Sequence, residues 1–362
     1  MTFARQPGPL AEGRILTRFA HPEPRRQPGP KVHPVFLPFA GCPQRCVFCN
    51  QAAQTGHGPE PLETILAHTR TELAALPAHA PPVELAFYGG TFTALPAPWP
   101  ARFLELGAEF KALGRLSRVR CSTRPDALTP ALLDDLAARG LDLVELGVQS
   151  YADHALSASL RGYDGATALA ACDMVKAAGL GLGIQLMPGM PGHTPQDFAR
   201  DVNTAAALGP NFARLYPCLV LEGTPLAEIW RAGEYTPWPL ETAIDALASA
   251  LLTLWAAGVP SARIGLAEQE GLGVLAGPRH PALGQMARAR ALLGHVTELL
   301  PTRHATADHA TADHATADTL FIPRRLQGEA LGQKDALAAD YAALGLRVAV
   351  WDEDDLALAA TA

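Results

Sequence analysis

The sequence predicts an α/β protein built on a parallel sheet. From Val35 onward, short runs rich in β-branched and aromatic residues alternate with longer segments that have a helical hydrophobic period. Threonine and proline begin several of these helices, and glycine ends them. The chemically unusual residues follow the predicted strands, at the end where parallel α/β folds assemble their sites. These observations leave two arrangements open, a barrel and an open sheet.

Six strands are expected between Val35 and Val220. They lie at residues 35–41, 83–90, 118–126, 142–150, 181–189 and 212–220. The first expected helix, residues 61–76, places its leucine and isoleucine side chains on one face. A later helix is capped by Thr129, has Pro130 in its first turn and ends at Gly140. Strands that alternate with helices in this way pair in parallel through right-handed crossovers.

Composition excludes several classes of protein. The 362 residues carry 29 Lys and Arg against 36 Asp and Glu, a net charge of -7, so the chain has no overall basic character for nucleic acid. We find neither an apolar run long enough to span a membrane nor the core of a signal peptide. We therefore expect a cytoplasmic protein with reduced thiols, in which Cys121, Cys172 and Cys218 are buried apolar residues.

Three further cysteines lie within eight residues directly after the first strand. They are Cys42, Cys46 and Cys49 in the segment GCPQRCVFCN. So dense a group of thiols in a chain without export signals indicates metal or cluster binding and not disulfides. A closed zinc site needs a fourth ligand, and His33 and His57 are too distant in the sequence to match the short spacings of zinc knuckles. Three cysteines suit a 4Fe-4S cluster whose fourth iron is open to another ligand.

This cysteine spacing, with Phe48 before the last cysteine, resembles the cluster loop of radical S-adenosylmethionine (SAM) enzymes. The resemblance implies a partial, six-unit TIM-like (β/α)6 barrel with two cofactors, a 4Fe-4S cluster and SAM. In that superfamily the open iron binds the amino and carboxylate groups of SAM. One electron from the cluster then breaks a carbon–sulfur bond and yields a 5'-deoxyadenosyl radical. An external electron donor of the flavodoxin or ferredoxin type is implied as a partner.

Motifs after the next three strands agree with this resemblance. Gly89, Gly90 and Thr91 resemble the glycine motif that receives the amino group of SAM, and the surrounding GGTFTALP is similar to the elongator catalytic subunit. The strings STRPD and ELGVQS also resemble that family, and oxygen-independent coproporphyrinogen III oxidase-like enzymes share the glutamine. By this resemblance, the SAM ribose and carboxylate are contacted by residues at Ser122, Gln149 and Arg161.

Three assignments in these motifs are open. Many relatives have an acidic residue at the position of Ser122, so a ribose contact there would be uncharged. Arg124 faces SAM, substrate or an acidic neighbour. Gln185 and Met187, in the fifth unit, are expected near SAM or in the lumen, with core packing as the alternative for the methionine. Tyr216 and Gln185 are the candidate groups on the substrate side, although no catalytic residue is identified.

The resemblance covers residues 35–238. We expect a Pro- and Arg-rich extended arm at residues 1–34 and a small C-terminal α/β extension at residues 239–362 that closes the open side of the barrel. Residues 304–318 repeat the pentad HATAD three times and are expected to form an exposed loop that is dispensable for cluster binding. No acetyltransferase domain of the elongator type is expected.

The sequence leaves the substrate open among RNA, a tetrapyrrole and another metabolite. It also leaves a second class of function open, a non-catalytic nucleic-acid-binding protein that carries zinc or an iron–sulfur cluster. The residues of the expected SAM pocket favour the enzyme, because they are spread over several strand ends and a binding module does not need them.

Overall fold

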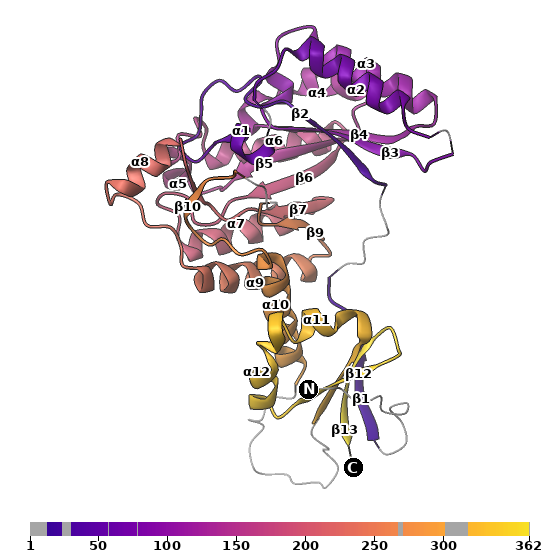
Figure 1. Cartoon of the computed structure of the whole chain (residues 1–362), viewed down its shortest axis with the longest axis vertical. Helices are drawn as coiled ribbons and strands as arrows, with labels where there is room; N and C mark the ends of the chain where they lie inside the picture. The colour runs from indigo at the N-terminus through magenta and orange to yellow at the C-terminus, as the bar shows by residue number, and fades with distance from the viewer. Residues whose placement is uncertain are drawn as a thin grey trace.

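The protein was analysed as a computed structural model, shown in Figure 1. The structure describes residues 13–23, 30–56, 58–77, 79–266, 271–300 and 318–361. His57 and nearly all of the HATAD repeat, residues 304–317, lie outside these ranges. Within the described ranges, no helix is long and apolar enough to cross a membrane.

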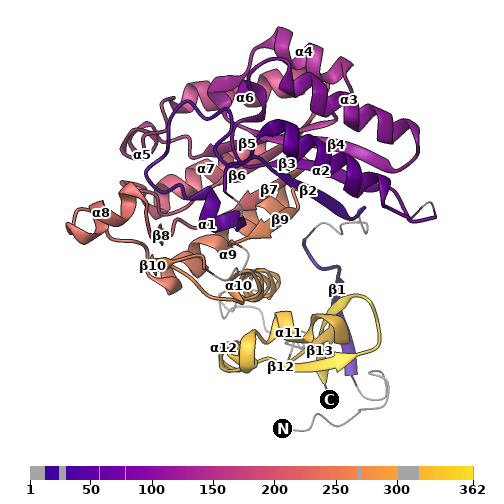
Figure 2. The same ribbon diagram turned by 45° about the horizontal axis from the view of Figure 1, so that its top comes forward.

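A seven-stranded parallel sheet curls into a half-barrel (Figures 1 and 2). Its strands, in spatial order, are β2 (Val32–Phe36), β3 (Val83–Tyr88), β4 (Leu116–Thr123), β5 (Leu143–Gln149), β6 (Gly181–Leu186), β7 (Phe212–Leu215) and β9 (Ser261–Ile264). Each of these strands pairs in parallel with its neighbour. The predicted partial TIM-like barrel is thus confirmed, with one more strand than expected.

The additional strand shows that the half-barrel continues beyond Trp238. β9 pairs with β7 through Ala213 and Ser261, so it completes the sheet and does not belong to a separate extension. β9 has only four residues and no strong alternation, which is why its sequence did not identify it as a barrel strand. The parallel sheet thus extends past residue 238, the boundary expected between the core and the extension.

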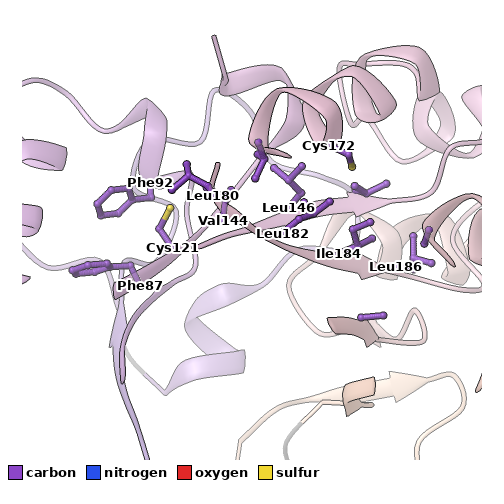
Figure 3. Packing of buried hydrophobic residues seen from close by; sticks show 14 of the residues in the cluster. Phe87, Phe92, Cys121, Val144, Leu146, Cys172, Leu180, Leu182, Ile184 and Leu186 are labelled. Atoms are coloured by element: carbon purple, nitrogen blue, oxygen red, sulfur yellow. The ribbon is translucent and has the colours of Figure 1, made fainter. Parts of the chain in front are cut away.

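The connecting helices pack on the sheet through one apolar core. The longer ones are α2 (Leu62–Ala74), α3 (Trp99–Ala112), α4 (Pro130–Ala138), α6 (Gly165–Ala177), α7 (Pro195–Leu208) and α9 (Leu240–Ala256). Thr129 caps α4, as predicted. At the start of α7, Thr194 and Asp197 form a capping box. Figure 3 shows Cys121 and Cys172 among the leucines and phenylalanines of this core. Cys218 is also buried among apolar side chains, so the three scattered cysteines are core residues as expected.

Shorter elements surround the strand ends. They are α1 (Gln51–Thr55), α5 (Asp153–Ala158), α8 (Pro225–Arg231), the antiparallel pair β8 (Val220–Leu221) and β10 (Val274–Ala276), and the 3-10 turns η1 (Phe92–Ala94) and η2 (Pro125–Ala127).

A second, smaller layer contains the C-terminal part of the chain (Figure 2). Its sheet has the order β1 (Gly13–Phe19), β13 (Leu356–Thr361), β11 (Thr319–Pro323) and β12 (Arg347–Trp351). The accompanying helices are α10 (Leu283–Leu299), η3 (Arg324–Leu326), α11 (Gln327–Ala330), η4 (Gln333–Asp335) and α12 (Ala338–Ala343). α10 supplies Leu292 and Val296 to the core of this layer.

Part of the segment that was expected to be an extended N-terminal arm forms a strand, β1. Residues 13–19 pair with β13, and Glu23 accepts hydrogen bonds from Ser261 and Arg288. The pairing joins the two ends of the chain in sequence, a long-range contact that the local Pro-rich composition does not reveal.

Candidate active site

A cavity of about 1110 Å³ lies inside the half-barrel and reaches its rim at the carboxyl ends of the strands. Its lining includes nearly all of the residues predicted to act in the site: Cys42, Cys46, Phe48, Cys49, Gly89, Gly90, Ser122, Arg124, Gln149, Arg161, Gln185, Met187 and Tyr216. Thr91 is the exception, since it is fully buried behind the cavity wall. The expected C-terminal extension, residues 239–362, contributes Pro260, Ala262, Arg263 and Leu266 to this lining, whereas no described residue of the lining belongs to the C-terminal sheet.

The cysteine loop directly follows β2, and short turns hold it. The amide of Cys42 donates to the Phe39 carbonyl at 3.1 Å, and the amide of Cys49 donates to the Cys46 carbonyl at 3.0 Å. Asn50 ends the loop because its side chain caps the first turn of α1. These turns gather the three sulfur atoms within a single segment of the cavity wall.

The cysteine loop is fastened to the loop after β3. The amide of Thr91 donates to the Ala40 carbonyl at 2.7 Å, and the Thr91 hydroxyl lies 3.3 Å from the Cys42 sulfur. Gly90 has a φ of +58° and lies so close that a Cβ atom there would be 2.2 Å from the Ala40 oxygen. The glycine motif therefore has a packing role, in addition to any contact with a ligand.

Gln51 strengthens this junction, and sequence reasoning missed it. Its side-chain oxygen accepts from the Phe39 amide at 2.6 Å and from the Gly90 amide at 2.9 Å. One acceptor thus joins the cysteine loop to the glycine loop. Its position two residues after Cys49 was the available signal, although nothing in the local pattern showed where the side chain points.

Two buried arginines stand beside Cys46. Arg161 donates from Nη1 to the Cys46 sulfur at 3.0 Å, and Nη1 of Arg124 lies 3.8 Å from the same atom. Asp126 pairs with Arg124 through both of its carboxylate oxygens. Tyr163 accepts from Arg161 at 2.9 Å and was not predicted.

The electrostatics of this corner suit a negatively charged group. Burial alone lowers the pKa of Arg161, but the neighbouring phenol and thiol outweigh that effect and raise it, so the side chain stays cationic. Burial raises the pKa of the Cys42 thiol, and raises that of Cys49 to about 12.

The expected SAM contacts around β5 and β6 also meet in the cavity wall. Gln149 ends β5 with a φ of +68°, an uncommon conformation for a residue other than glycine. Its side-chain oxygen accepts from Gln185 at 3.1 Å. Phe48 and Met187 pack in one apolar cluster with Cys46. Tyr216 follows β7 next to β6: its amide donates to the Leu186 carbonyl at 2.9 Å, and its hydroxyl accepts from Arg214 at 2.9 Å.

The donor set fits a cluster better than a single zinc ion. Among the described residues, no three Cys, His, Asp or Glu side chains converge on one metal position. His33 points elsewhere, with Nε2 3.2 Å from the Glu72 carboxylate. In a cluster the three cysteines would each ligate an iron, and Arg161, 3.0 Å from the Cys46 sulfur, would compensate negative charge there. The three cysteines, with the arginine pair behind Cys46, would hold such a group.

Sequence reasoning also missed the charged residues on the inner face of the sheet. Arg118 and Arg120 on β4 flank the lumen, and both contact Glu84 on β3. Arg120 also contacts Glu145, which pairs with Arg214 at 2.8 Å. The signal was present in RVRCS, where the inward positions of a buried strand are polar at a period of two.

The half-barrel and the three-cysteine loop at its rim together define the class of protein. Two family models identify the superfamily within that class. The model described as Radical SAM superfamily matches residues 36–205, and the one described as Radical_SAM C-terminal domain matches residues 210–293. The chain belongs to the radical SAM superfamily, and this membership indicates an enzyme. Its cofactors are a 4Fe-4S cluster and SAM.

Individual relatives agree with this assignment. The tRNA uridine(34) acetyltransferase of Methanocaldococcus infernus is 29% identical over 287 residues, 67% of this chain and 54% of that protein. The heme chaperone HemW of Mycobacterium tuberculosis is 30% identical over 207 residues, 55% of this chain and 53% of that protein. The archaeal Elp3 structure from M. infernus, with residues 1–46 deleted, shares the fold: its TM-score is 0.52 at 23% identity, covering 72% of this chain and 62% of that one. The chain spans about half the length of the curated relatives that it matches.

Proposed function

We propose that this protein cleaves SAM reductively and uses the resulting radical to activate a substrate held in the half-barrel. The observation that supports this most is the position of the cysteine loop: its three thiols open into a 1110 Å³ cavity beside the cationic Arg161. When bound, the cluster and SAM would supply the one-electron reductive chemistry that generates a radical able to abstract hydrogen from the substrate.

The residues of the chain position and shield these groups in the proposal. Cys42, Cys46 and Cys49 hold the cluster, and Arg161 with Arg124 balances its charge. The carbonyls near Gly89 and Gly90 accept from the SAM amino group, while Gln149 and Ser122 take its ribose hydroxyls. Burial of the arginines and of Phe48 keeps water from this corner.

An external donor of the flavodoxin or ferredoxin type would reduce the protein, which we place in the cytoplasm. The proposal leaves the substrate among RNA, a tetrapyrrole and another metabolite. The names of the relatives include both a tRNA uridine acetyltransferase and a heme chaperone, so they favour no single one of these.

The test is anaerobic reconstitution with iron and sulfide, followed by SAM and dithionite and quantification of 5'-deoxyadenosine. We expect product from the wild type and none from a triple variant with Cys42→Ala, Cys46→Ala and Cys49→Ala. The matched control is Cys172→Ala, which removes a buried thiol on α6, away from the cavity, and should retain product. A fully loaded wild type that produces no 5'-deoxyadenosine would contradict the proposal.

A further inference from the structure

The cavity is strongly cationic although the chain is acidic. Seven arginines line it: Arg45, Arg118, Arg120, Arg124, Arg161, Arg214 and Arg263. Glu84 and Glu145 are the acidic residues of the lining, whereas the whole chain has a net charge of -7. Positive charge is therefore concentrated inside the half-barrel.

The pairing of these arginines leaves positive charge uncompensated. Arg118, Arg120 and Arg214 share the two glutamates, and Asp126 neutralises Arg124 from behind the wall. Among the described residues, Arg45, Arg161 and Arg263 have no carboxylate partner. Arg161 serves the cysteine loop through Cys46. Arg45 and Arg263 are exposed, so water screens their charge. Arg118, Arg120 and Arg214 together carry one positive charge more than the two glutamates that they share, and this excess attracts an anion.

Two tyrosines in contact with these arginines indicate where in the cavity an anion would bind. Tyr88 accepts from Arg120 and Arg214, the latter at 3.0 Å, and Tyr216 accepts from Arg214 at 2.9 Å. A phenol oxygen that accepts from a guanidinium must direct its own proton elsewhere. Neither hydroxyl proton has an acceptor among the described residues, and both side chains line the cavity. Each is a polarised donor for a charge-assisted hydrogen bond.

The positions of Tyr88 and Tyr216 favour a contact with the substrate over a contact with SAM. Tyr88 directly precedes Gly89 on β3, and Tyr216 follows β7 on the other side of the lumen. The expected SAM contacts come from the cysteine loop, from Gly89 and Gly90 directly after β3, from Ser122 on β4 and from Gln149 on β5. The tyrosines and Arg214 therefore border the SAM pocket without belonging to it.

We propose that Tyr88, Tyr216 and Arg214 form a subsite for a carboxylate or phosphate of a small anionic metabolite, which is the substrate. This inference rests on the proposed function, because it names the class of molecule that the radical would activate. A small anion fits better than RNA because Arg120, Arg124, Arg161 and Arg214 are buried or half-buried in the cavity wall of an acidic chain. A polyanion instead requires a basic surface along which its phosphates lie.

The test is anaerobic titration calorimetry of the reconstituted full chain with succinate, inorganic phosphate and, as a neutral counterpart, succinamide. Saturating SAM without reductant fills the SAM contacts, and sodium chloride keeps ionic strength constant. We expect both anions to bind, with Kd on the order of 1 mM or below, and succinamide not to bind. Arg214→Met should weaken anion binding at least about tenfold.

Two milder variants guard against misfolding of the arginine variant. Tyr88→Phe and Tyr216→Phe remove only the hydroxyls and should each weaken binding about three- to tenfold. Arg70→Met, which loses an exposed arginine paired with Glu109 on the outer helices, should bind as the wild type does.

Three results would overturn the proposal: no anion binding by the wild type, equal binding by all variants, or tight binding of an RNA hairpin that succinate does not displace. SAM cleavage by the wild type is assayed separately. Anion binding without SAM cleavage would reject the proposed reaction, and SAM cleavage without anion binding would reject the subsite.

Discussion

Replacing Gly90 with alanine should damage the junction that holds the cysteine loop. At φ +58° a side chain costs about 1–2 kcal/mol for backbone strain alone. The added Cβ would also lie 2.2 Å from the Ala40 oxygen and 2.6 Å from the Leu37 oxygen, both of them backbone atoms. The loop would have to retreat by about 1 Å, and overpacking of this kind costs about 1–3 kcal/mol more.

Gly114 provides the matched control because its φ is +67° and nothing lies within 4 Å of the position that a Cβ atom would take there. Gly114→Ala should therefore show the strain without the collision. At about 2 °C of melting temperature per kcal/mol, we expect a decrease of about 4–10 °C for Gly90→Ala and about 2–4 °C for Gly114→Ala. Only the first variant should also lose iron, since Ala40 leads into Cys42.

The assay combines thermal unfolding followed by circular dichroism with iron and sulfide content after reconstitution. If both variants melted at the same temperature and held the same amount of iron, the close approach of the two loops would have no energetic consequence. The reasoning about Gly90 would then be refuted.

Gln51→Leu should reduce iron content and lower the melting temperature by several degrees, since it leaves two backbone amides without an acceptor at about 1–3 kcal/mol each. Gln51→Glu keeps an acceptor oxygen, and its apoprotein should be closer to the wild type in thermal unfolding; equal losses would exclude the hydrogen bonds as the cause. Burial alone would raise the pKa of Glu23, but its hydrogen bonds and ion pair with Arg288 outweigh this and lower it below 4.5. A carboxyl group whose pKa is lowered on folding stabilises the fold at pH above its unfolded pKa, and this stabilisation is lost as the pH falls through its folded pKa. The wild type should therefore have a higher melting temperature than Glu23→Gln at pH 7 and lose that advantage below about pH 4.5. A constant difference between pH 7 and pH 3 would show that Glu23 acts without its charge.

The sequence predicted the parts of the site that depend on local spacing. Three cysteines within eight residues restrict their sulfur atoms to one loop whatever the rest of the chain does, so the sequence alone suffices to propose them as a ligand set. Glycine pairs and residues such as Gln149 were also found, because parallel strands bring their carboxyl ends to a common edge. The segment 261–267 was expected to be strand-like, but its pairing with β7 was missed, as was the pairing of β1 with β13, since no local pattern shows a long-range partner.

By itself the sequence determined the alternation of strands and helices, the cysteine loop and the apolar nature of the scattered cysteines, since hydrophobic period and residue spacing act over short distances. Only the tertiary structure decided which side chains face one another. It placed Gln51 between two loops and brought Arg161 to Cys46 across 115 positions of the chain. It also gathered inward arginines from separate strands around one cavity. The physical reason is that the curvature of the sheet sets these distances, and that curvature is a property of all its strands together.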